Sequence, residues 1–167
     1  MTLRFHTCET DVGWLSLILS DDGLRYITMP RRSRDQSVRD AIEAGAADQA
    51  PEPDARTFVD AVKSATSGRG DSNGVRFDWF GITPFRRAVM EECMRIPAGQ
   101  TRSYGDLAAR VGRPAAARAV GRVMATNPFP FIVPCHRVVG STGGLHGYGG
   151  GLDMKAQLLR AEGARLG

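Results

Sequence analysis

The chain has 167 residues, 42% hydrophobic and 24% charged, with a formal net charge of +4, which is the composition of a globular protein. No run approaches the roughly 20 uninterrupted apolar residues of a membrane span, and the first residues, with Arg4, His6 and Glu9, lack the apolar core of a secretory signal. Three cysteines are too few for a disulfide framework and fit a reducing compartment, so we expect a cytoplasmic protein. We also expect a monomer in solution that does not bind membranes.

The first predicted element is a β-hairpin. Val12–Ser20 is rich in apolar residues, and the tight-turn signal Asp21-Asp22-Gly23 follows it. A second apolar run, Leu24–Met29, is ended by Pro30. These features predict two antiparallel strands near the start of the chain.

A connection with little regular structure is predicted next. Residues 31–56 are polar, charged and Ala-rich, with Pro51 and Pro53, so we expect a mobile connection that contains one short helix. Apolar spacing then predicts a helix over Asp54–Ser67, and the alternation at 75–79 predicts another strand. The first half should therefore be a small antiparallel sheet with a helix packed on it.

Charge divides the chain into two unequal halves. Residues 1–82 carry 10 basic and 13 acidic side chains, a net −3, whereas residues 83–167 carry 12 and 5, a net +7. Only Lys63 and Lys155 are lysines, so the basic half is built from arginine, which binds phosphate in a bidentate way. A genome that favours arginine codons would explain the arginine bias equally well. The charge asymmetry makes nucleic acid the leading partner class, and we place a domain boundary at residue 82.

The second half is predicted to be mainly helical. Thr83-Pro84 is a helix start, and apolar residues recur at helical spacing from there to Ile96. Ser103 can cap a second helix, and a Gly/Pro turn at 112–114 separates it from a third over Ala115 to about Thr126. Two short helices with a brief turn between them form the helix-turn-helix pattern.

The third predicted helix has a basic face. Arg118 and Arg122 are four residues apart and share one side, where the small residues Ala119 and Gly121 allow close approach to a groove. This pattern alone leaves two interpretations open, DNA binding or an ordinary helical core.

The most informative segment places a thiol beside an imidazole and a guanidinium, Cys135-His136-Arg137, after an apolar run. A cysteine becomes nucleophilic as its thiolate, which a neighbouring base or positive charge favours. The alternative is a buried cysteine in a strand with an exposed histidine next to it, since neighbouring residues of a strand point to opposite sides.

The string Pro-Cys135-His136-Arg137-Val resembles the active-site signature of the O6-alkylguanine-DNA alkyltransferases. The resemblance is strong from about Thr83 to the C-terminus and weaker before it. Further blocks in the order and spacing of that family are Ser103–Ala108, Ala117–Gly121, Asn127-Pro128, Gly147–Gly151 and Leu158–Glu162. The resemblance implies an α+β fold with two domains. A small N-terminal domain of an antiparallel sheet and a helix (1–82) precedes a mainly helical domain (83–167) with a winged-helix-like helix-turn-helix.

The resemblance also implies a reaction. The protein would repair double-stranded DNA by moving the alkyl group of O6-alkylguanine, and of O4-alkylthymine, irreversibly onto its own Cys135, once per molecule. In the family pattern His136 is the general base that acts through a bridging water, and Glu162 orients its imidazole. No cofactor or metal is implied, and His6 with Cys8 falls short of a zinc site.

The target guanine must leave the base stack to reach a protein thiol. By resemblance Arg118 enters the vacated space, and Tyr104 rotates the target phosphate and then faces the flipped base. Ala119, Gly121 and Arg122 would contact DNA, although Arg122 stands where the family usually has a small residue. The residues implied to line the substrate pocket are Tyr104, Met124, Asn127, Pro130, Val138, Tyr148 and Gly149.

Two rival functions are weighed against alkyl transfer. Alkyltransferase-like proteins recognise damaged DNA without repairing it, but they lack the cysteine that this chain has at position 135. A cysteine hydrolase could use Cys135 and His136, but it would have no need for Arg118 on a helix-turn-helix.

Overall fold

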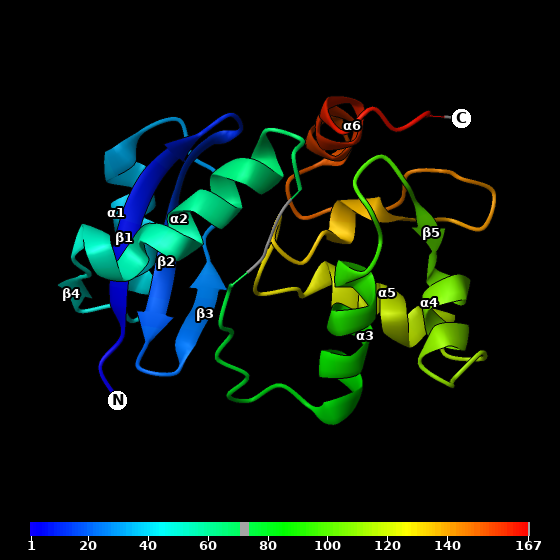
Figure 1. Ribbon diagram of the computed structural model, residues 1–167, viewed down its shortest axis with the longest axis horizontal. Coiled ribbons are helices and arrows are strands. Elements are labelled where there is room, and N and C mark those ends of the chain that lie inside the picture. Colours follow the sequence, from blue (N-terminus) through cyan, green and yellow to red (C-terminus); the bar gives the residue numbers. More distant parts are fainter. Residues whose placement is uncertain (71–73, 167) are drawn as a thin grey trace.

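The computed structural model describes residues 1–70 and 74–166, and it is the α+β fold that the sequence predicts. In Figure 1 the sheet with α1 and α2 forms one side of the molecule, and the helices from α3 onward form the other. The elements in chain order are β1 (Arg4–Thr10), β2 (Gly13–Ser20), β3 (Gly23–Ile27), α1 (Arg34–Glu43), β4 (Asp48–Gln49), α2 (Glu52–Thr66), α3 (Pro84–Met94), β5 (Arg102–Ser103), α4 (Tyr104–Arg110), α5 (Ala117–Ala125), the 3-10 turn η1 (Cys135–Arg137), β6 (Val138–Val139) and α6 (Leu152–Ala161).

The N-terminal sheet has the strand order β3-β2-β1-β4. The predicted hairpin is confirmed as β2 and β3, and β1 pairs with β2 in the antiparallel sense. The sheet is not wholly antiparallel, however, because the two-residue strand β4 lies parallel to β1. Side chains of β2 alternate between its two faces, and both faces are covered. Leu17 packs in the cluster that includes α2, and Ile18 packs in a second cluster with Ala41 of α1.

Strand β1 was missed by the sequence analysis. Its inward residues are Phe5 and Cys8, while most of its other side chains are polar and only partly buried. Strand β1 therefore owes its place to backbone pairing along the whole of β2, from Arg4–Leu19 to Thr10–Gly13. A periodicity of apolar residues does not reveal such a strand.

The segment 31–56 has more regular structure than the predicted mobile connection with one short helix. It contains α1, β4 and the first turn of α2, which starts at Glu52 rather than Asp54. Helix α1 is capped by the Ser33 hydroxyl, and its Ser37 hydroxyl contacts that of Ser16 on β2 at 2.8 Å. Only Ser37 and Ala41 of α1 are buried, so its contact with the sheet is too narrow and too polar to show as a hydrophobic pattern.

The predicted strand at 75–79 was wrong. This stretch makes a single bridge to the sheet, at Leu24, through hydrogen bonds of 2.8 Å with Arg76 and Asp78. The alternating aromatic residues pack across the molecule instead, and the rings of Phe77 and Trp79 lie 4.8 and 5.7 Å from that of Phe129.

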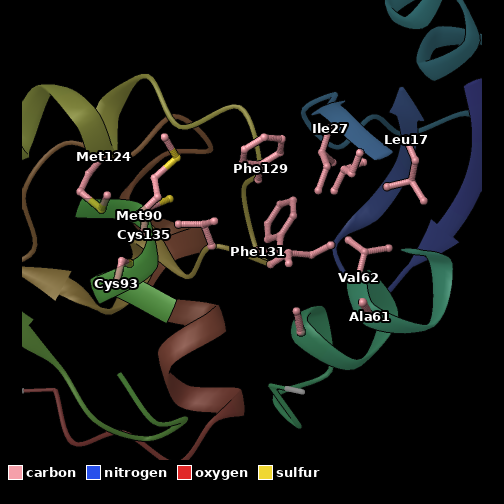
Figure 2. Packing of buried hydrophobic residues seen from close by; sticks show 14 of the residues in the cluster. Leu17, Ile27, Ala61, Val62, Met90, Cys93, Met124, Phe129, Phe131 and Cys135 are labelled. Atoms are coloured by element: carbon pink, nitrogen blue, oxygen red, sulfur yellow. The ribbon is translucent and has the colours of Figure 1, made fainter. Parts of the chain in front are cut away.

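One hydrophobic cluster extends through both sides of the molecule. Figure 2 shows Leu17, Ile27 and Val62 of the N-terminal side facing Phe129 and Phe131. On the opposite side the same cluster continues to Met90, Cys93, Met124 and Cys135. A backbone hydrogen bond of 2.9 Å from Ile27 to Pro128 also joins β3 to this middle segment. The segment before Cys135 is thus held between the sheet and the helices, and the domain boundary at residue 82 stays a prediction.

Helices α4 and α5 are short and pack on each other, which is consistent with the predicted helix-turn-helix. Ser103 and Asp106 form a capping box at the start of α4, with two hydrogen bonds of 3.0 Å. Residues 111–116 connect α4 to α5, whose buried side carries Val120 and Val123. Among the described residues, no helix is both long and apolar enough to span a lipid bilayer.

Candidate active site

The segment that leads into Cys135 is a folded loop held by one asparagine. The Asn127 side chain accepts a hydrogen bond from the Phe129 backbone and donates one to the Val133 carbonyl, both 2.9 Å long. Between them Phe131 has φ 72°, the one positive φ of a non-glycine residue in the described ranges. A non-glycine residue keeps this conformation only where its surroundings enforce it, and the Phe131 side chain is fully buried.

Cys135 begins the 3-10 turn η1 and is 6% exposed. The alternative of an extended strand with an exposed histidine is wrong, because the segment is a 3-10 turn and His136 is fully buried. Burial raises the pKa of the Cys135 thiol, while a hydrogen bond from Asn127 and the charge of Lys155 lower it in part. The resting side chain is therefore a thiol, and a base is required to make it nucleophilic.

His136 and Glu162 meet at the centre of the site. The His136 Nε2 and Glu162 Oε1 atoms are 2.8 Å apart, and both side chains are fully buried. Although burial raises the pKa of Glu162, hydrogen bonds from His136 and Arg137 lower it to about 2, so the carboxylate is ionised and can only accept. The Nε2–H of His136 therefore donates to Glu162, and its Nδ1 carries the free lone pair.

The Nδ1 atom of His136 is buried and has no hydrogen-bonding partner within the part of the chain that the structure describes. Burial lowers the pKa of His136, against the hydrogen bond and charge of Glu162, so the imidazole is neutral at pH 7. A neutral imidazole with its tautomer fixed by a carboxylate is a competent general base. The structure thus brings Glu162 to His136, the residue that follows Cys135 in the chain.

Arg137 completes this cluster and was not predicted. Its Nε and Nη2 donate to the Glu162 carboxylate over 2.6–3.1 Å, and its Nη1 donates to the Ile96 carbonyl at 2.6 Å. Arg137 thereby joins η1 to the residues that follow the ends of α3 and α6. The sequence shows Arg137 next to His136, but its partners Ile96 and Glu162 are distant in the sequence, so their contacts with Arg137 could not be predicted.

We predict that acid destabilises the protein through this cluster. The lowered pKa of native His136 means that, below its ordinary value of 6.5, the unfolded chain binds a proton that the native protein refuses. Stability should therefore fall as the pH drops from 7 to 5.5, by at most about 1.4 kcal/mol per pH unit for this one group. Glu162 adds a second loss from pH 4.5 downward.

Urea denaturation at several pH values measures this effect. His136→Gln should flatten the dependence between pH 7 and 5.5, whatever it does to the stability at pH 7. An equal slope in the two proteins would assign the acid sensitivity to other groups.

The glycine-rich loop, residues 140–151, carries Tyr148, which packs against the hydrophobic cluster that contains Cys135. Tyr148 is partly buried, and its hydroxyl has no hydrogen-bonding partner among the described residues. Burial, together with the nearby Cys135 and Glu162, raises the pKa of Tyr148 well above its usual value. Gly149 is exposed, whereas a Cβ atom at Gly150 would collide with the Met154 side chain and would contact Tyr148 and Met29 closely. Because Met29 belongs to the N-terminal side, both sides of the molecule hold this loop.

The remaining predicted pocket residues are wholly or partly buried. Met124, Pro130 and Val138 are buried, and Tyr104 is partly buried at the start of α4. Burial, and then the coulombic influence of Cys135, raise the pKa of Tyr104. Parallel pairing of β5 with β6, from Arg102 to Val138, holds Tyr104 beside the active-site turn.

The predicted DNA-contacting residues lie on the outside of α5. Arg118 and Arg122 are exposed, four residues apart, on the side opposite the buried Val120 and Val123. Ala119 is partly buried, and Gly121 faces the Tyr104 ring, where a Cβ atom would lie 3.9 Å from it. The structure thus separates an outer basic face from the inner group around Cys135.

The fold and the site define a class of protein, in which two short packed helices, α4 and α5, accompany a buried cysteine and a histidine–glutamate pair. The family model "6-O-methylguanine DNA methyltransferase, DNA binding domain" matches residues 84–164. A methylated-DNA–protein-cysteine methyltransferase of Mycobacterium bovis is 35% identical over 164 residues, 98% of this chain and 94% of that protein. The chain therefore belongs to the methylated-DNA–protein-cysteine methyltransferase family.

Other comparisons agree with this assignment. The enzyme of the same name from Salmonella typhimurium is 54% identical over 86 residues, which is 52% of this chain and 50% of that protein. The crystal structure of Mycobacterium tuberculosis OGT in complex with DNA has a TM-score of 0.77 and 33% identity, and the match covers 96% of this chain and 93% of that one.

Proposed function

We propose that the protein repairs double-stranded DNA by transferring the alkyl group of O6-alkylguanine, and of O4-alkylthymine, to its own Cys135. The observation that carries this proposal is the buried His136–Glu162 contact of 2.8 Å next to a buried cysteine, with the Nδ1 of His136 left as the free base. Membership of the family gives the substrate, since the relatives are named for methylated DNA and for a cysteine acceptor.

The chemistry follows from the protonation states. The His136 Nδ1 takes the Cys135 proton through a bridging water, and the thiolate sulfur attacks the alkyl carbon. A C–S bond forms as the C–O6 bond breaks, and the bonding electron pair stays with the guanine. The imidazolium, which Glu162 stabilises, gives its proton to the departing base. The product is a stable thioether, so each molecule reacts once.

The surrounding groups would hold the flipped base. Tyr104 and Tyr148 pack against the cluster that contains Cys135, and the exposed backbone at Gly149 would donate a hydrogen bond to O6. The carbonyls near Cys135 and Val138 would accept from the guanine edge, and Asn127 holds the loop that contains Pro130. In this proposal the reaction uses only side chains and backbone groups of the protein itself.

Mass spectrometry of the intact protein tests the proposal. After incubation with duplex DNA that holds one O6-methylguanine, the protein should gain the mass of one methylene group, and peptide mapping should locate it on Cys135. A non-catalytic damage-recognition protein would bind this DNA without a change in mass. A cysteine hydrolase would leave the DNA adduct unchanged.

We predict that His136→Ala slows transfer by about 10²- to 10⁴-fold at neutral pH, the usual contribution of a positioned general base. Single-turnover kinetics with methylated duplex DNA measure the rate. Raising the pH should recover part of the loss, because hydroxide can then remove the thiol proton. A rate within a factor of three of wild type would show that the base lies elsewhere.

The cellular setting is part of the same proposal. We place the protein in the cytoplasm as a monomer, in keeping with its three free cysteines, which a reducing compartment preserves. Sedimentation of the purified protein tests the oligomeric state.

A further inference from the structure

The C-terminal end of α2 meets the buried pair of Arg137 and Glu162. Helix α2 belongs to the N-terminal side, and in Figure 1 its last turn lies beside α6. A Cβ atom at Gly68 would collide with the carbonyl of Ala161, the last residue of α6. A Cβ atom at Gly70 would lie 2.6 Å from the Arg137 Nη2 atom and 3.1 Å from the Ala98 Cβ atom. The backbone after α2 therefore comes closer to the pair than a residue with a side chain could.

Hydrogen bonds fix the backbone at this helix end. The N–H groups of Arg69 and Gly70 both donate to the Ser64 carbonyl, at 3.0 and 3.2 Å. Gly68 has φ 87° and follows the C-cap residue Ser67, a position where helix termination alone explains a glycine. Gly70 has φ 67° and lies beyond that cap. Its approach to the buried pair is therefore a separate feature, which the end of the helix does not require.

A second turn packs on the pair from the end of α3. A Cβ atom at Gly99 would lie 2.9 Å from the backbone carbonyl oxygen of Glu162. The side chains of Arg137 and Glu162 are 4% and 0% exposed, so little water reaches their contact. An ion pair attracts more strongly away from water, and close backbone packing from two segments maintains this condition.

The Arg137 guanidinium is fully engaged where Gly70 meets it. Its Nη1 donates to the Ile96 carbonyl at 2.6 Å, and its Nε donates to the Glu162 carboxylate. Its Nη2, the atom nearest to Gly70, donates to Glu162 Oε1 at 2.6 Å. The same Oε1 atom lies 2.8 Å from His136 Nε2. A displacement of Nη2 would therefore act on the oxygen atom that holds the imidazole.

We propose that Gly70 is a positioning residue for alkyl transfer, because its backbone holds the Arg137 guanidinium on the Glu162 oxygen atom that orients His136. The inference rests on the proposed role of His136 as the general base. It gives the N-terminal side of the molecule a part in the reaction, since Gly70 directly follows the capped end of α2.

A displacement of Nη2 has an effect of definite sign on His136. Burial lowers the pKa of His136, Glu162 raises it, and the charges of Arg137 and Lys155 lower it further. If Arg137 moves away from Glu162, the carboxylate charge is less neutralised and the pKa of His136 rises. A larger fraction of the imidazole is then protonated at mildly acidic pH and cannot accept the thiol proton.

Gly70→Ala tests the proposal, because it adds only the Cβ atom. In single-turnover reactions with saturating methylated duplex DNA, the acid limb of the pH–rate profile should move up by about one pH unit. The rate on that limb should therefore be about tenfold lower than that of wild type, and the two rates should converge by pH 9.

Gly81→Ala is the matched control. Gly81 has φ 75°, so alanine introduces a similar backbone strain, but a Cβ atom there meets nothing within 4 Å. Its profile should keep the wild-type midpoint. If the Gly70→Ala profile matched that of Gly81→Ala, or if its loss were equal at every pH, the proposal would be overturned.

A double substitution identifies the atom that transmits the effect. Arg137→Lys keeps the charge but lacks Nη2, so adding Gly70→Ala to it should shift the profile no further. An undiminished shift in that background would also overturn the proposal. If Gly70→Ala does not fold, Gly70→Asn carries the same Cβ atom and accepts a positive φ more readily. Failure of the wild-type protein to gain a methyl group on Cys135 would instead overturn the proposed function.

Discussion

Replacing Cys135 by serine is expected to abolish alkyl transfer while DNA binding persists. A serine hydroxyl fits the space of the thiol, but it ionises far less readily and is a much weaker nucleophile. Because Cys135 is 6% exposed within an apolar cluster, the new hydroxyl should also cost about 1–3 kcal/mol of stability. Transfer is measured by intact mass after reaction with methylated duplex DNA, and binding by titration of the same DNA.

Cys8 provides a matched control for this loss. It is also 6% exposed, but it lies in β1 on the other side of the shared core. Cys8→Ser should lose a similar amount of stability and keep the wild-type transfer rate. Methylation of the Cys135→Ser protein at a comparable rate would assign the acceptor to another residue.

The parts of the fold that the sequence predicted are those with strong local signals. Asp21-Asp22-Gly23 marks the hairpin of β2 and β3, and Thr83-Pro84 marks the start of α3, whose Thr83 side chain accepts from Arg86. Strand β1 and helix α1 were missed or undervalued because their stability comes from partners. Pairing with β2 holds β1, and a small buried face that includes Ser37 holds α1.

The candidate site shows the same division. The reactive pair Cys135-His136 is visible in the sequence because its chemistry is local. Glu162 was reached only through resemblance to a family, since nothing in residues 152–162 indicates which side chain meets His136. Arg137 and Lys155 donate hydrogen bonds to the carbonyls of Ile96, Val138 and His146, and such contacts with backbone atoms leave no signal in a sequence.

Arg118→Ala is expected to separate base flipping from thiol chemistry. Arg118 is exposed on α5, away from the buried group around Cys135, so its removal should leave the reaction of the thiol with the free base O6-benzylguanine within about a factor of two. If Arg118 fills the space that the flipped guanine leaves, repair of duplex DNA should fall sharply in this variant. Extruding a base costs a few kcal/mol, so a loss of about 10²-fold or more is expected.

Arg122 is the matched control, since it lies one turn along the same exposed side of α5 and carries the same charge. If Arg122 contacts a phosphate, Arg122→Ala should weaken binding to any duplex and lower by about one the slope of the logarithm of the binding constant against that of the salt concentration. Saturating DNA should then restore the repair rate of this variant. Saturating DNA should not rescue Arg118→Ala, because its defect follows binding. Equal losses for Arg118→Ala on duplex DNA and on the free base would place the effect in the pocket or the fold, and the role in base flipping would have to be given up.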